Sequence, residues 1–285
     1  MENALELRNV SRSFSDFHLG EISFDLPSGT ILGLVGENGA GKSTTIRLIM
    51  DALRPDGGTI RVLGMDNRDP GFRQLKEDIG VVLDEAYFPE SLNAVQVGKV
   101  MAATYSRWDQ GLYESYLTRF NLPEKKPFKD FSRGMRMKLA IAVALSHQPR
   151  LLILDEDTSG LDPIVRDEVL DIFNEFTREE DHSILLSSHI VSDLEKICDY
   201  IAFLHKGKLV LFEEKDQLLE RYGLFTGSAE ELEALAPEAV VAREGNRYGG
   251  VRALVKRELA PAGMRLEQPT VEDIILSLVK GAVTR

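Results

Sequence analysis

Residues 31–53 read ILGLVGENGAGKSTTIRLIMDAL, in which an apolar run, a glycine-rich turn and an amphipathic stretch follow one another directly. The run ILGLV has the length and composition of a buried strand, whereas KSTTIRLIMDAL has the spacing of a helix. The turn GENGAG lies between them. The stretch therefore predicts a strand that enters a helix through a tight loop, as in an α/β domain.

The rest of the chain continues this alternation. Strand-like runs return at LLILD, HSILLSS and YIAFLH, all between residues 151 and 205, with helical stretches between them. This order predicts an α/β fold with a mostly parallel core sheet. The runs ALELRNV, HLGEISFDL and TIRVLG, nearer the N-terminus, favour a small antiparallel sheet that flanks the core.

Two regions differ from this pattern. Residues from about 93 to 147 are helical throughout and predict a helical subdomain. After the core ends near residue 215, KDQLLERYG and AEELEAL predict helices, VVAREGNRYGGVRALVK predicts two strands, and PTVEDIILSLVK predicts a final helix. We therefore expect a main domain over 1–215 and a small α+β appendage over 216–285.

Composition limits the class of protein. The chain has 285 residues, of which 43% are hydrophobic and 28% are charged, and a formal net charge of −12. These values are typical of a folded, soluble protein, and no apolar run approaches the roughly 20 residues that span a bilayer. The N-terminus lacks the pattern of a signal peptide, so we expect a cytoplasmic protein. The negative charge argues against nucleic acid as a partner.

The stretch GLVGENGAGKST matches the pattern G-x-x-x-x-G-K-[ST], which predicts a polyphosphate-binding loop. Backbone N–H groups at the helix start would surround a polyphosphate, and Lys42 would reach the β- and γ-phosphates. Ser43 would bind Mg²⁺. The alternative is a glycine-rich turn that only joins strand to helix. The candidate nucleotide-binding residues of the loop are Gly36, Asn38, Gly39, Gly41, Lys42, Ser43 and Thr44.

A phosphate-binding loop needs a second acid for the metal, and LLILDEDTSGLDP supplies it. Asp155, at the end of a buried strand, would hold Mg²⁺ through water. Glu156 follows directly and points differently, so it is the candidate general base that polarises the attacking water. The alternative is an acidic N-cap region, because Asp162 and Pro163 suit a loop that enters a helix.

The stretch FSRGMRMKLAIAVAL at 131–145 opens a helix with a serine and a glycine, Ser132 and Gly134, which the apolar stripe does not need. Free N–H groups and a hydroxyl at a helix start form an anion site. The chain would then carry two anion sites for one nucleotide. We therefore expect Ser132 and Gly134 to bind the γ-phosphate of an ATP held by another subunit.

The order GENGAGKST, FSRGM, LLILDEDTSGLD and SSH resembles the nucleotide-binding subunit of an ABC transporter, over about residues 1–215. The resemblance implies a P-loop NTPase core with antiparallel and helical subdomains, and ATP hydrolysis with Mg²⁺. It also implies a head-to-tail dimer that holds two ATP, each between one P-loop and the other subunit's signature motif. FSRGM is the signature motif of this sequence.

The resemblance implies roles for further residues. Phe14 matches the aromatic residue that stacks on adenine, and His189 matches the switch histidine that contacts the γ-phosphate. Asp162, with Ser159, matches the loop through which the two sites communicate. Asp84 stands where a glutamine usually contacts Mg²⁺, or Glu85 does if the register slips by one residue.

The sequence also departs from the usual pattern. In the signature motif, Arg133 replaces a second glycine and Met135 replaces a glutamine, a variant similar to that of bacterial ABC-2 exporters. Asp157 stands where proline is common, which would loosen the loop and add charge beside Glu156.

Three functions remain open from the sequence. The first is the ATPase of an exporter, a homodimer or a heterodimer with a related subunit, bound to an integral membrane permease at the inner face of the cell membrane. The second is a soluble ABC-type ATPase in assembly or regulation; the roughly 90 residues between Lys42 and Ser132 leave no room for a long coiled coil. The third is a module that binds ATP without hydrolysis, which Asp84 and Asp157 suggest.

Overall fold

The computed structural model describes residues 2–83, 88–155, 162–245, 250–261 and 263–283. Its central sheet has the strand order β10-β9-β3-β8-β7-β6, with all pairs parallel except the β9–β10 hairpin. Both faces of this sheet are covered, which explains why LLILD is buried at every position and apolar at the four positions before Asp155. The strands are β3 (Ile31–Val35), β6 (Ile79–Val82), β7 (Leu151–Asp155), β8 (Ser183–Ser188), β9 (Tyr200–His205) and β10 (Lys208–Glu214).

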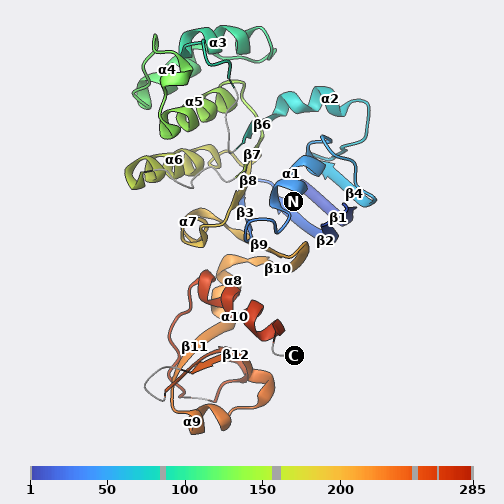
Figure 1. The fold of residues 1–285 in the computed structure, drawn as a ribbon, viewed down its shortest axis with the longest axis vertical. Coiled ribbons are helices and arrows are strands. Elements are labelled where there is room, and N and C mark those ends of the chain that lie inside the picture. The colour runs from blue at the N-terminus through green and yellow to red at the C-terminus, as the bar shows by residue number, and fades with distance from the viewer. Residues whose placement is uncertain (1, 84–87, 156–161, 246–249, 262, 284–285) are drawn as a thin grey trace.

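Two hydrophobic clusters lie on opposite faces of the central sheet, because successive strand residues point to opposite sides. One contains Leu151 and Ile153 and packs under helix α1 (Lys42–Ile49) and the antiparallel sheet. The other contains Leu152 and Leu154 and packs against α5 (Arg133–Ser146), α6 (Pro163–Phe176) and α7 (Val191–Ile197). Figure 1 shows α5, α6 and α7 one after another along this second face.

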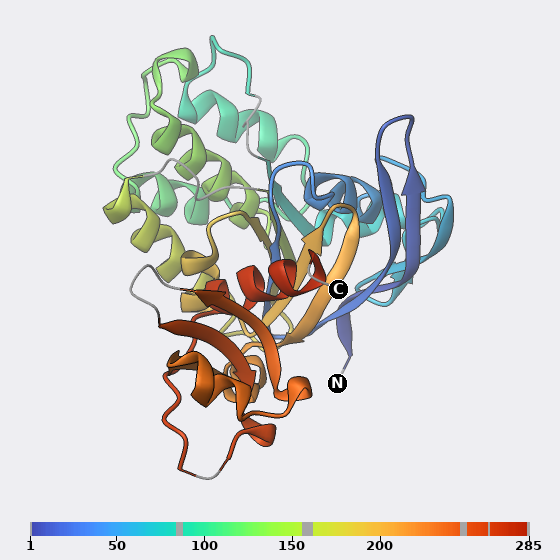
Figure 2. The same cartoon turned by 60° about the horizontal axis from the view of Figure 1, so that its bottom comes forward.

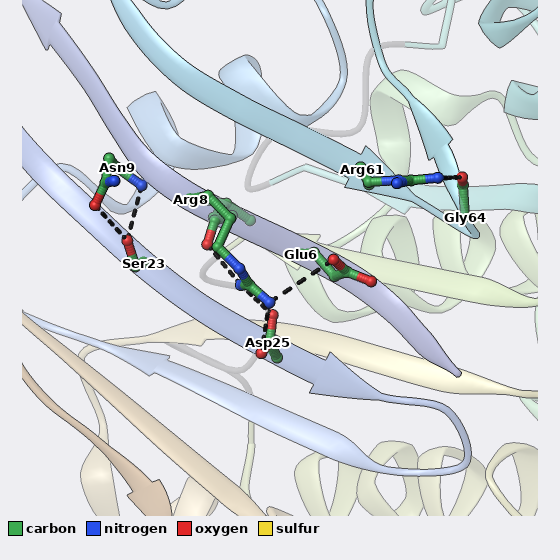
Figure 3. Close-up of polar contacts among 8 residues, drawn as sticks. Glu6, Arg8, Asn9, Ser23, Asp25, Arg61 and Gly64 are labelled. Atoms are coloured by element: carbon green, nitrogen blue, oxygen red, sulfur yellow. Dashed lines mark hydrogen bonds and ion pairs between the residues drawn. The ribbon is translucent and has the colours of Figure 1, made fainter. Parts of the chain in front are cut away.

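The antiparallel sheet has the strand order β2-β1-β4-β5 and flanks the core beside α1 (Figure 1). Its inner residues are buried, and its outer surface is polar. Figure 3 shows the guanidinium of Arg8 between the carboxylates of Glu6 and Asp25, and Ser23 Oγ accepting the N–H of Asn9 at 2.8 Å. The elements of this region are β1 (Asn3–Ser13), β2 (His18–Pro27), β4 (Gly57–Val62), β5 (Met65–Asp66), α2 (Phe72–Leu75) and the short 3-10 helix η1 (Lys76–Asp78).

The helical subdomain packs around one aromatic residue. Tyr113 is fully buried and donates its hydroxyl to the carbonyl oxygen of Ala94 at 2.8 Å. Burial raises the pKa of Tyr113. Asn93 and Gln96 form a capping box, and Asp109 caps the next helix. The elements are α3 (Ala94–Ala102), α4 (Gln110–Arg119), the short 3-10 helix η2 (Phe128–Asp130) and α5.

A buried histidine joins the helical subdomain to the core. His147, just after α5, stacks on Tyr105 with ring centroids 4.0 Å apart, and its Nδ1 lies 3.1 Å from the carbonyl oxygen of Glu77. Burial lowers the pKa of His147, because the charged ring would lose its hydration. Arg107 donates to the same carbonyl oxygen at 3.0 Å. These contacts fix the helical subdomain to the segment that enters β6.

The C-terminal residues form an α+β module, whose sheet has the order β11-β13-β12. Helix α10 packs against this sheet and against α7 of the core (Figure 2). Val271, Ile274 and Leu254 consequently belong to the same hydrophobic cluster as the residues of α7. The elements are α8 (Lys215–Arg221), β11 (Tyr222–Gly227), α9 (Ala229–Glu233), the 3-10 helix η3 (Pro237–Ala239), β12 (Val240–Gly245), β13 (Val251–Lys256), the 3-10 helix η4 (Arg257–Leu259) and α10 (Val271–Val283).

The predicted α/β class, the flanking antiparallel sheet, the helical subdomain and the α+β appendage are all confirmed. One segment forms a different element from the one that was predicted. The sequence indicated a helix through Gly223, but the helix ends at Arg221 and β11 begins at Tyr222. The reason is tertiary, because Tyr222–Gly227 pairs along its whole length with β13. Within the described residues, no helix is long and apolar enough to span a bilayer.

The packing of α3 against Tyr113 gives a test of the helical subdomain. A Cβ at Gly98 would lie 2.5 Å from Cε1 of Tyr113, whose ring is buried and held by its hydrogen bond. We expect Gly98→Ala to lower the free energy of unfolding by about 1–3 kcal/mol, although alanine favours a helix by about 1 kcal/mol. Urea unfolding followed by circular dichroism measures the change.

Gly245→Ala is the control, because a Cβ there meets nothing within 4 Å. A Gly98→Ala variant that is as stable as the unmodified chain would show that α3 does not pack on Tyr113 as described.

Candidate active site

The loop between β3 and α1 is held by its own lysine. Lys42 is 3% exposed, and its Nζ donates to the carbonyl oxygens of Gly36 at 2.7 Å and Glu37 at 3.3 Å. Gly41, which precedes α1, has φ 112°, in the region that favours glycine. The side chain of Lys42 thus reaches back from the start of α1 to the carbonyl oxygens at the beginning of the loop.

Close neighbours explain the glycines of the loop. A Cβ at Gly36 would lie 2.6 Å from the carbonyl oxygen of Leu204 in β9. A Cβ at Gly41 would lie 2.7 Å from Cδ1 of Leu19 in β2. The loop is therefore packed from behind by two strands, while its other side borders a cavity.

That cavity has a volume of about 480 Å³, within the usual range for ligand sites. It is lined by Phe17, Asn38, Gly39, Gly41, Lys42, Ser43, Thr44 and Asp155. The structure thus brings most of the predicted loop residues together with Asp155, which lies more than a hundred residues later in the chain. Gly36, the remaining loop residue, lies behind the cavity and holds Lys42 through its carbonyl oxygen.

Asp155 ends β7 and is 8% exposed. Among the described residues, its Oδ1 has no hydrogen-bond partner although it is buried. Such an oxygen, in one cavity with the hydroxyl of Ser43, fits a Mg²⁺ ion, which prefers carboxylate and hydroxyl oxygens. The described residues hold no cluster of three or more His, Cys, Asp or Glu, so phosphates and water would supply the other ligands.

The aromatic residue that borders the cavity is Phe17, which the sequence did not single out. Phe14, the predicted adenine-stacking residue, is 43% exposed, and its ring centroid lies 6.2 Å from that of Phe17. The N–H of Phe14 donates to the carbonyl oxygen of Phe17, so one turn holds both rings. The stacking role of Phe14 stays a prediction, and Phe17 is a second candidate for the same surface.

The turn between β9 and β10 also contacts the phosphate-binding loop. The N–H of Gly207 donates to the carbonyl oxygen of Ala40 at 3.1 Å. His205 Nδ1 lies 3.1 Å from Oε1 of Glu37. Neither contact could be predicted from the sequence, because neither residue belongs to a recognisable pattern. This turn therefore supports the loop at Ala40 and Glu37.

The remaining predicted residues stand at the starts of three neighbouring helices. Ser132 caps α5 and accepts the N–H of Met135 at 3.3 Å, with Gly134 in the first turn. Asp162 caps α6 and accepts the N–H of Ile164 at 3.0 Å. His189 is exposed between β8 and α7. None of these four residues is among those that line the described cavity.

Several predicted residues lie outside the described residues, so their roles stay predictions. They are Asp84, Glu85, Glu156, Asp157 and Ser159.

Comparison with known proteins places this geometry in a family. The family model described as ABC transporter matches residues 19–159. The lantibiotic transport ATP-binding protein SrtF of Streptococcus pyogenes is 35% identical over 74% of this chain and 91% of its own length. The bacitracin transport ATP-binding protein BcrA of Enterococcus faecalis is 32% identical over 74% of this chain and 69% of its own length.

A solved structure, an ATP-binding subunit of an ABC transporter, superposes with a TM-score of 0.69 at 29% identity and covers 75% of this chain and 91% of its own. The phosphate-binding loop and Asp155 line one cavity, which fits the description of these relatives as ATP-binding proteins. The chain therefore belongs to the ABC transporter family, as an ATP-binding subunit that hydrolyses ATP.

Proposed function

We propose that this chain is the ATPase of an exporter, which pairs with itself or a close relative around two ATP molecules and drives a separate membrane permease. The observation that carries the dimer is the position of Ser132. It caps a 14-residue helix whose first turn contains no acid, yet it is not among the residues that line the cavity of Lys42. Such a helix start favours an anion, which a second subunit would present.

Within each site, each residue has its own role in ATP hydrolysis. Lys42 binds the β- and γ-phosphates, and the N–H groups at the start of α1 bind the same oxygens. Ser43 and Asp155 hold Mg²⁺, with Asp84 as a further candidate ligand, and the ion when bound neutralises charge on the phosphates. Glu156 takes the proton of the attacking water. His189 orients that water and contacts the γ-phosphate.

The relatives support a membrane partner. The relatives named above are transport proteins for bacitracin and lantibiotics, so a peptide-like or lipid-like cargo is the proposal for this chain. The complex would lie at the inner face of the cell membrane.

The division between the two subunits can be tested with two substitutions. Lys42→Ala removes a charge-assisted contact with the phosphates, so we expect the affinity of the monomer for ATP to fall about 10- to 100-fold. Ser132→Arg blocks the surface offered to the other subunit, so monomer affinity should be unchanged while turnover is lost. Calorimetric titration with ATP and phosphate release measure the two quantities. Equal loss of affinity in both variants would contradict the assignment of Ser132 to the neighbouring ATP.

The role of Glu156 predicts a trapped dimer. Glu156→Gln cannot accept the proton of water, so ATP should remain intact and hold the two subunits together. With saturating ATP and Mg²⁺, light scattering should report twice the mass of one chain. A variant that stays monomeric under these conditions would rule out the two-ATP dimer.

Recovery of partners from membranes tests the proposed function directly. The tagged chain, purified from gently solubilised native membranes, should carry a polytopic membrane protein that mass spectrometry identifies. The Lys42→Ala variant is a matched control, because docking to a permease does not need bound ATP. If both forms recover only soluble proteins, the chain acts as a soluble ATPase in assembly or regulation.

A further inference from the structure

Helices α6 and α7 are joined by a buried ion pair. Arg166 Nη1 lies 3.3 Å from Asp193 Oδ1. The side chain of Asp193 is 2% exposed and that of Arg166 is 22% exposed. Within the described part of the chain, Asp193 Oδ2 and Arg166 Nε have no hydrogen-bond partner although both are buried.

A pair of this kind is a weak source of stability. Removing a carboxylate from water is expensive, and a single 3.3 Å contact with one oxygen left over returns only part of that energy. An apolar pair of similar size would often be as stable. The presence of the Arg166–Asp193 pair in the core points instead to a role in fixing the position of α6 relative to α7.

The same two helices carry a second ion pair that offers a comparison. Lys196 Nζ lies 3.1 Å from Asp167 Oδ1, and their side chains are 57% and 67% exposed. Solvent screens such a pair, and it contributes little to the position of either helix. Asp167 and Asp193 thus differ in burial, although both carboxylates link α6 to α7.

The buried pair lies in the first turns of two helices that follow predicted site residues. Arg166 is in the first turn of α6, whose N-cap is Asp162, and Asp193 is in the first turn of α7, which follows His189. On the other side of α6, Glu168 pairs with Lys138 of α5 at 2.7 Å. Helix α6 is therefore tied to both neighbours, between which it lies in Figure 1. Ser132 caps α5, Asp162 caps α6, and His189 precedes α7.

We propose that Arg166 and Asp193 are positioning residues for ATP hydrolysis. Their contact sets the start of α7, and hence His189, relative to the start of α6 and the end of β7. The inference rests on the role of His189 under the proposed function. Neither side chain is among those that line the cavity of Lys42, so the pair affects turnover and leaves nucleotide binding alone.

The first test is kinetic. Asp193→Asn keeps the size of the side chain and removes its charge, so we expect kcat for phosphate release from the purified chain to fall about 5- to 20-fold, with KM for ATP unchanged. The matched control is Asp167→Asn, at the exposed pair between the same helices, which should retain the kcat of the unmodified chain. Thermal unfolding of each variant gives the fraction of the protein that is folded, and kcat is calculated per folded molecule.

Substitutions of the arginine separate positioning from simple packing. Arg166→Lys keeps the charge and should retain more of kcat than Arg166→Met, which keeps the length and the apolar contacts. If the two variants lose kcat equally, packing alone explains the effect and the proposal is wrong. A kcat for Asp193→Asn equal to that of the unmodified chain overturns it as well, and so does a parallel rise in KM.

A double-mutant cycle separates this inference from the function on which it rests. If His189→Ala lowers kcat and adding Asp193→Asn has no further effect, the carboxylate acts through the histidine, as proposed. If the two losses multiply, the pair acts elsewhere and the proposal fails. If His189→Ala alone leaves kcat intact, the assigned role of His189 fails, and the inference fails with it.

Discussion

The loop after β3 must be open to a polyphosphate on one side and rigid on the other, and this constraint shapes the rest of the domain. A free glycine-rich loop would be flexible, because glycine gains most from disorder. Here the carbonyl oxygen of Leu204, the side chain of Leu19 and the N–H of Gly207 all contact it from behind. Strands β2 and β9 therefore serve the site as directly as β3 does, although they carry no catalytic group.

Much of the fold could be predicted because local sequence and tertiary position agree. LLILD is apolar at the four positions before Asp155 because β7 is covered on both faces, and the alternation of strand and helix predicts a parallel sheet. Strand β11 could not be predicted in this way. Tyr222 and Gly223 follow a good helix-forming stretch, and only pairing with β13, about thirty residues later, makes them a strand.

The residues of the candidate site also fall into two groups, those that the sequence predicts and those that it does not. Lys42, Ser43 and Asp155 stand in patterns whose spacing alone predicts phosphate and metal binding, and the structure brings them to one cavity. Phe17, His205 and the pair of Arg166 with Asp193 stand in no such pattern. His205 and the ion pair depend on contacts between residues distant in sequence, and a spacing rule cannot detect a contact across 27 residues or more. Phe17 borders the cavity from a turn that no motif marks.

The strand order has a consequence for how the protein is made. β3 lies between β8 and β9, and Leu34 pairs in register with Ser187, so both neighbours of β3 emerge from the ribosome about 150 residues after it. At a synthesis rate of 5–20 residues per second, β3 waits roughly 8 to 30 seconds with its edges unpaired. The nascent chain is therefore exposed to aggregation through a strand that is apolar at every position, and it is a natural client for chaperones that bind extended apolar segments during translation.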